Sequence, residues 1–176
     1  MKSIFLRLIS VVFVFIFLIW LAGYLLPRSY SIQSSVDIAA APDKIFPLVN
    51  ELPNWRDWSP WGAEGLEVQY SGEAAGVGSI QTWSDPRGDG KLYITDSQAN
   101  EKVTYKMRSG GFPEMESSIE LSSSDGNTSV TWSSEGELPN GAFYGFFALL
   151  FQSGMQAEYD RGLAKLKSVA ERNATE

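Results

Sequence analysis

Cysteine and histidine are both absent from the 176 residues of this chain. Without cysteine, the chain forms no disulfide and offers no thiolate to a metal ion. Without histidine, it lacks the common zinc ligand and the base of the Ser-His-Asp and Cys-His nucleophile pairs. Any catalysis would therefore depend on carboxylates, Lys, Arg, Tyr or water. The sequence predicts no catalytic residue, no metal site and no cofactor, and it does not favour an enzyme.

Positive charge is also scarce. Acidic residues outnumber Lys and Arg by 21 to 14, which gives a net charge of −7 at pH 7. Proteins that bind nucleic acids gain much of their affinity from Lys and Arg side chains that neutralise phosphates. We therefore expect no nucleic-acid partner.

One long hydrophobic run lies near the N-terminus. Residues 8–26 carry no charge, and nineteen helical residues at about 1.5 Å each fit a bilayer core of roughly 30 Å. Trp20 and Tyr24 would lie at the membrane interface, as amphipathic aromatic rings do. The alternative is a cleaved signal peptide, but its apolar region usually spans only about 7–15 residues. We predict a single-pass transmembrane anchor.

Charges on either side of this run suggest its orientation. Lys2 and Arg7 precede the span and only Arg28 follows it closely, so the positive-inside rule places the N-terminus in the cytoplasm. The remaining chain would then face the periplasm or the cell exterior. We expect an anchor at residues 1–28, a single domain at residues 29–172 and a tail at residues 173–176.

Alternating apolar and polar residues predict that this domain begins with a strand over Tyr30–Ile38. A short helix starts near Pro42, where Pro47 is expected to kink or shorten it. A second short helix or turn follows at Asn54–Trp61. Turn signals then separate six further predicted strands. They are Leu66–Ser71, Gly78–Ser84, Lys91–Gln98, Lys102–Arg108, Met115–Ser122 and Thr128–Gly136.

The last element is one long amphipathic helix, with Asn140 as its expected N-cap. Its apolar residues recur at helical spacing: Phe143, Phe147, Phe151, Met155, Tyr159, Leu163 and Leu166. Short hairpins imply an antiparallel sheet, and one long helix would cover the apolar face of that sheet. The fold class is therefore α+β, with two layers.

This order of elements and several short motifs resemble one family. The motifs are residues 36–38 leading into 41–46, Asn54-Trp55 through Trp58-Ser59-Pro60-Trp61, residues 76–79 with Trp83, residues 128–132 and residues 162–167. Together they resemble the polyketide cyclase/dehydrase and lipid-transport family of the START-like (SRPBCC) helix-grip superfamily, in its membrane-anchored bacterial form. The match covers about residues 30–170.

The resemblance implies a curved antiparallel sheet that grips the long helix around a cavity for lipids, sterols, polyketides or other apolar molecules. Pro47 departs from the expected pattern, because a helix former would be expected there. Polyketide cyclases place ionisable residues in this cavity, whereas this chain offers no histidine and no obvious acid-base pair. Fold alone therefore does not justify a cyclase activity.

Large apolar side chains are the candidates for lining that cavity. They are Trp55, Trp58, Trp61, Trp83, Tyr105, Met107, Trp132, Phe143, Phe147 and Phe151. Each could instead be an ordinary core residue. The run 142–151 is apolar on every face, which leaves three alternatives: a buried helix start, a gate hinged at Gly141 or Gly145, and a patch that touches the membrane.

Three functions remain open from the sequence. The first is a membrane-anchored binding protein for a hydrophobic small molecule or lipid. The second is an enzyme of the cyclase or dehydratase type. The third is a ligand-free interaction domain of a membrane complex.

Overall fold

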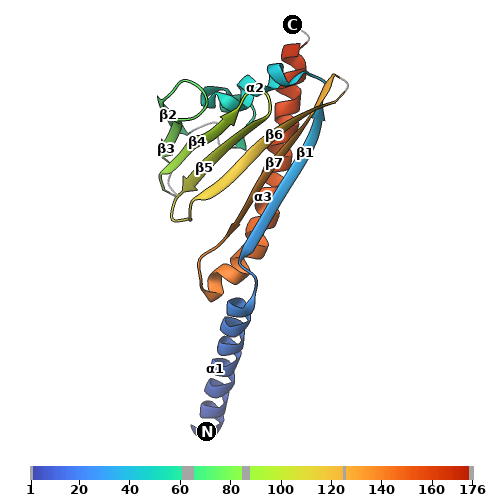
Figure 1. The fold of residues 1–176 in the computed structure, drawn as a ribbon. Helices are drawn as coiled ribbons and strands as arrows, with labels where there is room; N and C mark the ends of the chain where they lie inside the picture. Colours follow the sequence, from blue (N-terminus) through green and yellow to red (C-terminus); the bar gives the residue numbers. More distant parts are fainter. Residues whose placement is uncertain (1, 61–65, 85–87, 125, 175–176) are drawn as a thin grey trace.

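The computed structural model describes residues 2–60, 66–84, 88–124 and 126–174. An N-terminal helix, α1 (Lys2–Leu25), extends away from one end of a two-layer domain (Figure 1). We call this end of the domain, where α1 joins it, the proximal end, and the opposite end the distal end. Helix α1 is long and apolar enough over Arg7–Leu25 to cross a membrane.

The described residues of the domain form a seven-stranded antiparallel sheet in the order β1-β7-β6-β5-β4-β3-β2. Short turns connect most of the strands from β2 to β7 in a meander, and β1 pairs with the free edge of β7. The strand bounds agree with the sequence-based prediction to within two residues. They are β1 (Ser29–Ile38), β2 (Glu67–Gly72), β3 (Ser79–Ser84), β4 (Gly90–Gln98), β5 (Lys102–Ser109), β6 (Met115–Ser124) and β7 (Asn127–Glu137).

One face of this sheet is apolar and buried, and the other is polar. Alternate residues of β5 and β7, such as Val103 and Tyr105 or Val130 and Trp132, point into the core. Hydroxyl pairs such as Ser35–Thr131 and Ser118–Ser133 lie on the opposite face. The period-2 alternation of the sequence therefore produces a sheet that needs covering on one side only.

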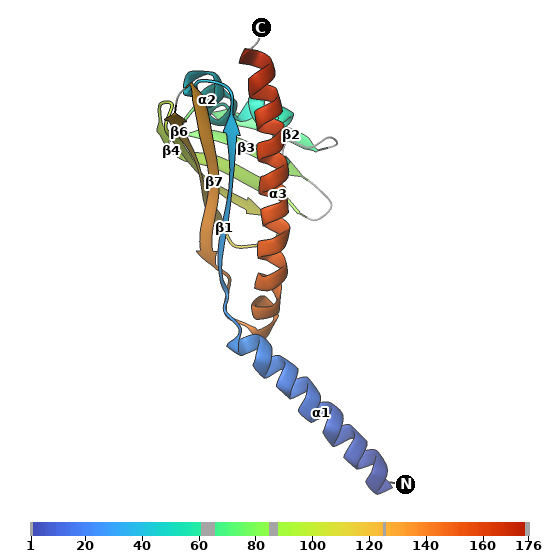
Figure 2. The ribbon, with the colours of Figure 1, turned by 90° about the vertical axis from the view of Figure 1, so that its right-hand side faces the viewer.

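Helix α3 (Ala142–Ala174) supplies most of that cover, running along β1 and across the inner face of the sheet (Figure 2). Two short helices, α2 (Pro42–Asn50) and η1 (Leu52–Asp57), close the distal end. Helix α2 continues past Pro47 to Asn50. In so short a helix, proline removes only one backbone hydrogen bond, and Pro47 does not end α2. Whether it kinks the helix stays a prediction.

The start of α3 differs from the sequence-based expectation. The Gly141 carbonyl accepts the first hydrogen bonds of the helix, from the N–H groups of Tyr144 and Gly145. Gly141, with φ of 148°, therefore holds the cap position that was predicted for Asn140.

This architecture confirms the predicted helix-grip, α+β fold class: a curved antiparallel sheet with a long C-terminal helix, preceded by an apolar N-terminal helix. A register shift between Ile94 and Asp96 in the β4–β5 pair is a β-bulge, a feature that increases local twist and bending of a sheet.

Candidate functional site

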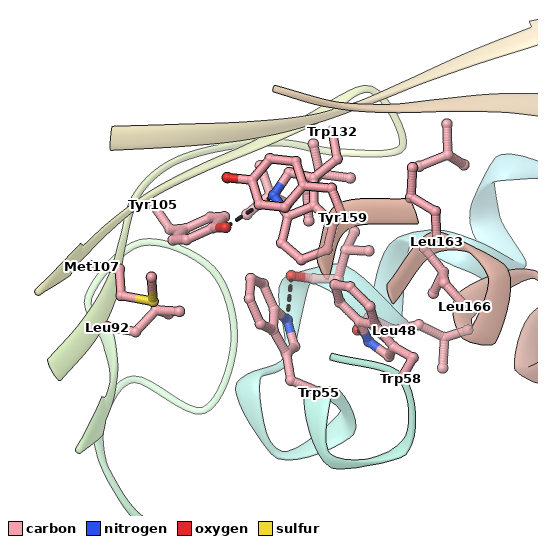
Figure 3. Packing of buried hydrophobic residues seen from close by; sticks show 14 of the residues in the cluster. Leu48, Trp55, Trp58, Leu92, Tyr105, Met107, Trp132, Tyr159, Leu163 and Leu166 are labelled. Atoms are coloured by element: carbon pink, nitrogen blue, oxygen red, sulfur yellow. Dashed lines mark hydrogen bonds between the residues drawn. The ribbon is translucent and has the colours of Figure 1, made fainter. Parts of the chain in front are cut away.

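A cluster of aromatic side chains fills the distal half of the space between the sheet and α3 (Figure 3). Trp132 of β7 stacks face to face on Tyr159 of α3, with ring centroids 4.1 Å apart. Trp55 contacts Trp58 at 4.9 Å and Tyr105 at 5.0 Å. All five side chains are fully buried. The sheet and helix are therefore in direct contact in this half of the domain.

The polar atoms of these rings are hydrogen-bonded. The Trp132 indole N–H donates to the Tyr105 hydroxyl at 2.9 Å, and the Trp55 indole N–H donates to the Val49 carbonyl at 3.0 Å. The Tyr159 hydroxyl lies 3.2 Å from the Ser117 hydroxyl. Such bonds offset the cost of burying indole and phenol groups.

Two ionisable groups lie in this cluster, the phenols of Tyr105 and Tyr159. Burial raises the pKa of Tyr105 well above its ordinary value and also raises the pKa of Tyr159. Both phenols therefore stay protonated at neutral pH. They can donate or accept hydrogen bonds, but they are poor general bases.

Most of the predicted cavity residues belong to one core. Trp55, Trp58, Trp83, Tyr105, Met107 and Trp132 are buried in it, and Phe147 and Phe151 are partly buried against it. Phe143 is 67 % exposed, and Trp61 lies outside the described residues. Whether any of these side chains touches a ligand stays a prediction.

A cleft of 170 Å³ opens at the proximal end of the domain, and we call it the proximal cleft. Its apolar walls come from β1, β6, α3 and the segments that flank β6 and β7. These walls are Tyr30, Phe112, Met115, Leu138 and Phe151. The Tyr30 ring meets Phe151 edge to face at 5.1 Å, and Phe112 stacks on Phe147 at 5.3 Å.

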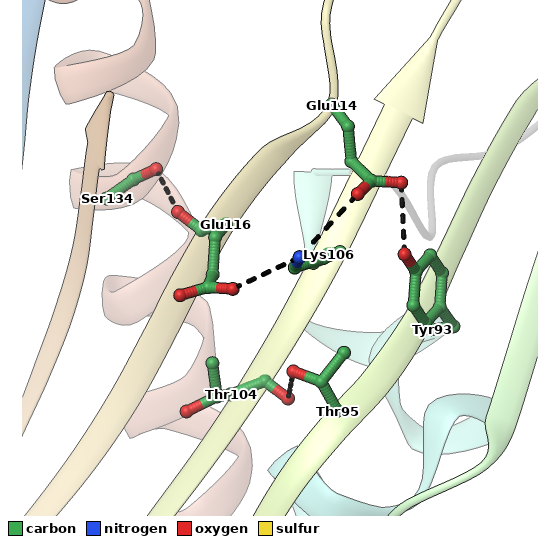
Figure 4. A network of polar contacts seen from close by, with 7 residues as sticks. All are labelled: Tyr93, Thr95, Thr104, Lys106, Glu114, Glu116 and Ser134. Carbon is green, nitrogen blue, oxygen red and sulfur yellow. Dashed lines mark hydrogen bonds and ion pairs between the residues drawn. The ribbon is translucent and has the colours of Figure 1, made fainter. Parts of the chain in front are cut away.

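Carboxylates surround the proximal cleft on its solvent side. Its lining includes Glu114, Glu116, Glu135 and Glu137. Lys106 lies 3.8 Å from Glu114 and 3.6 Å from Glu116, and the Tyr93 hydroxyl donates to Glu114 at 3.0 Å (Figure 4). Arg28 pairs with Glu137 at 3.3 Å. The four carboxylates outnumber the two cations that pair with them.

A second cleft, of 360 Å³, lies near the opposite edge of the sheet, at β2, β3 and β4. Trp83 lines it beside charged residues that include Glu67, Asp89, Lys91 and Arg108. This lining is mostly polar, whereas pockets for apolar molecules are lined mainly by hydrophobic and aromatic side chains. The proximal cleft is therefore the better candidate for an apolar ligand, although it is smaller.

Sequence reasoning identified only Phe151 among the apolar walls of the proximal cleft. Tyr30 was detectable, because the alternation along β1 places it on the inner face together with Ile32. Phe112 lies in the turn between β5 and β6 and gave no periodic signal. Its role depends on a contact with Phe147, thirty-five positions along the chain, which no local pattern reveals.

Comparison with protein families gives a match over nearly the whole domain. The model of the family described as polyketide cyclase/dehydrase and lipid transport matches residues 29–171. No curated protein matches the sequence closely enough to count as a relative.

Solved structures share this architecture at low sequence identity. Protein CV1439 from Chromobacterium violaceum is 15 % identical, with a TM-score of 0.60 over 80 % of this chain and 96 % of that one. Aha1 from Colwellia psychrerythraea is 20 % identical, with a TM-score of 0.59 over 81 % and 97 %. CalU16 from Micromonospora echinospora is 13 % identical, with a TM-score of 0.53 over 82 % and 81 %. These likenesses establish the fold alone.

Proposed function

The chain belongs to the polyketide cyclase/dehydrase and lipid transport family, and on this basis we propose that it is a membrane-anchored binding protein for a hydrophobic small molecule or lipid. In this proposal, residues 1–28 anchor the protein in the inner membrane and residues 29–172 form a periplasmic binding domain. The observation that carries the proposal is the proximal cleft, a recess with five apolar walls and four carboxylates at the end of the domain where α1 joins it.

Packing along α3 supports this location for the ligand. In the distal half of the helix, Tyr159, Leu163 and Leu166 are fully or almost fully buried. In the proximal half, Phe147 and Phe151 are only partly buried. Side chains that make fewer contacts move at lower cost, so a ligand would enter the domain at its proximal end.

The size of the cleft limits what it holds. Pockets that enclose a whole small molecule usually measure roughly 300–1,000 Å³, whereas this cleft measures 170 Å³. We propose that it takes one end of a chain-like apolar molecule, with the remainder still in the bilayer.

The negative charge of the carboxylates at the proximal cleft determines which headgroups can bind there. An anionic headgroup beside Glu114, Glu116 and Glu135 would be repelled, because like charges at close range are unfavourable. An uncharged or cationic headgroup avoids this repulsion. The preferred ligand is therefore an uncharged or cationic lipid or small molecule.

A binding titration tests this function. We would measure the binding of a fluorescent long-chain alcohol to the full chain held in amphipol, and we expect saturable binding. The Phe112→Asp substitution places a carboxylate in the apolar wall and should weaken binding by about tenfold or more, which corresponds to about 1.4 kcal/mol.

The matched control is Val77→Asp, which also puts a carboxylate in place of an exposed apolar side chain but lies far from the cleft. It should bind as the native chain does. Non-saturable binding by the native chain, or equal weakening by both substitutions, would contradict the proposal.

A further inference from the structure

Four large apolar side chains lie exposed on the first turns of α3. Phe143 is 67 % exposed, Phe146 41 %, Leu149 59 % and Leu150 73 %. We call this group the α3 apolar face. Contiguous exposed apolar patches of this kind usually mark binding surfaces. The question is what covers this one.

A contact between α3 and α1 places the α3 apolar face next to the end of α1. Gly23 of α1 and Gly145 of α3 lie so close that a Cβ on Gly145 would be 1.9 Å from the Gly23 carbonyl oxygen. A Cβ on Gly23 would be 2.4 Å from the Ala142 carbonyl oxygen. The start of α3 therefore lies beside the last turn of the apolar stretch Arg7–Leu25 (Figures 1 and 2).

The segment between β7 and α3 returns the chain to the end of α1. Strand β7 ends at Glu137, whose carboxylate pairs with Arg28, and the Leu138 N–H donates to the Arg28 carbonyl at 3.0 Å. From there, residues 138–157 carry no charged side chain. The uncharged stretch 8–27 therefore ends, and the uncharged stretch 138–157 begins, at the Arg28–Glu137 ion pair. The two stretches meet where the last turn of α1 contacts the first turn of α3.

Distances along the helix match the thickness of the membrane interface. Leu150 is five residues beyond Gly145, or about 7 Å along a helix that rises about 1.5 Å per residue. The headgroup layer on each side of a bilayer is about 5–7 Å thick, because the full bilayer measures about 40–45 Å and its hydrocarbon core about 30 Å. The α3 apolar face therefore spans the depth of that layer.

We propose that the α3 apolar face is a second membrane contact, in which the first turns of α3 are immersed in the outer headgroup layer of the lipid bilayer. This inference rests on the proposed anchoring of α1. The lipid surface is favoured over a second copy of the chain because the face continues the exposed apolar surface of α1. It also brings the proximal cleft, which Phe151 lines, next to the bilayer.

The lack of cysteine allows a direct test by site-specific labelling. Single variants Leu149→Cys and Leu150→Cys of the full chain would be labelled with an environment-sensitive fluorophore and reconstituted in phosphatidylcholine vesicles with and without nitroxide-bearing lipids. Val14→Cys in α1 reports on the anchor, and Lys165→Cys, an exposed site farther along α3, is the solvent control.

We expect lipid nitroxides to reduce fluorescence at positions 14, 149 and 150 and to leave position 165 unchanged. Loss at position 14 alone would overturn the second contact while leaving the anchor intact. No loss at position 14 would overturn the anchor, and this inference with it. Protection of positions 149 and 150 from aqueous iodide without quenching by lipid would indicate a second copy of the chain instead, and would also overturn the inference.

Discussion

Trp132 lies where β7, α3 and η1 meet. Its ring contacts Tyr159, Trp58 and Trp55 at centroid distances of 4.1, 5.4 and 6.4 Å, and its indole N–H donates to Tyr105. Gly162 leaves room for the indole, because a Cβ there would lie 2.7 Å from its ring. The distal core is thus a set of interlocking rings with buried hydrogen bonds.

Tyr105→Phe tests the importance of those hydrogen bonds. The substitution keeps the ring but removes the acceptor of the buried Trp132 N–H. We expect the free energy of unfolding to fall by about 1–3 kcal/mol, measured by urea unfolding of the full chain in detergent. Tyr93→Phe, which removes the solvent-exposed phenol that bonds Glu114, should cost much less. Equal effects would show that the buried bond has no special importance.

Glu171 near the end of α3 should make stability depend on acid pH. Its carboxylate accepts a hydrogen bond from the Ala39 N–H at 3.0 Å, and this bond, with Lys167 nearby, lowers the pKa of Glu171 below the ordinary value of 4.5. A lowered folded-state pKa means that the stabilisation is complete above the unfolded-state pKa and is lost as pH falls through the folded-state pKa.

Glu171→Gln should therefore destabilise the protein at pH 7, and the difference from the native chain should shrink as pH falls below about 4.5. Urea unfolding midpoints between pH 3 and pH 7 measure this difference. Glu101→Gln, a surface substitution in the β4–β5 turn, is the control. A difference that stays constant across this pH range would contradict the assigned role of Glu171.

At the scale of elements, the contact of α1 with α3 depends on two glycines. Gly145→Ala would push a methyl group into the Gly23 backbone, so the two helices must separate. We expect faster trypsin cleavage after Arg28 in the full chain in nanodiscs. Gly154→Ala makes the same change in the same helix, where nothing lies within 4 Å of the new Cβ, and it should not increase cleavage. Equal cleavage rates would show that the helices are not held together by this contact.

The strands were predictable because each has a local signal. Alternation marks the inner face, and short turns such as Asn100-Glu101 mark the ends, so the bounds of the strands follow from nearby residues. The position of β1 beside β7 was not predicted, since no local pattern brings residues 29–38 to residues 127–137.

The long helix was predictable, but the direction of its first residues was not. The residues Phe143, Phe147, Phe151, Met155 and Tyr159 recur every four positions, whereas a helix turns once in about 3.6 residues. Each step therefore advances about 40° around the axis, and Phe143 ends about 160° away from Tyr159. This drift explains why Tyr159 is buried while Phe143 is exposed. Of the three alternatives for the run 142–151, a fully buried helix start is excluded.

At the scale of the whole molecule, the two ends of the domain differ in how tightly they are packed. The distal end is closed by α2, η1 and the aromatic core, while the proximal end carries the cleft, the α3 apolar face and α1. If α1 anchors the chain as proposed, the domain presents its least tightly packed region to the bilayer. The sequence indicated an anchor and an apolar interior, but the location of the cleft required the contacts of Phe112 and Tyr30.

The most direct test of this account is a map of photochemical cross-links. The full chain in nanodiscs would be irradiated with an uncharged long-chain alcohol that carries a diazirine beside its hydroxyl group, and the modified peptides would be identified by mass spectrometry. We predict adducts at Phe112–Glu116 and around Phe151 that an excess of unlabelled alcohol removes and that the corresponding fatty-acid anion removes less well. Adducts confined to α1, or adducts at the cleft that no competitor removes, would contradict ligand binding in the proximal cleft.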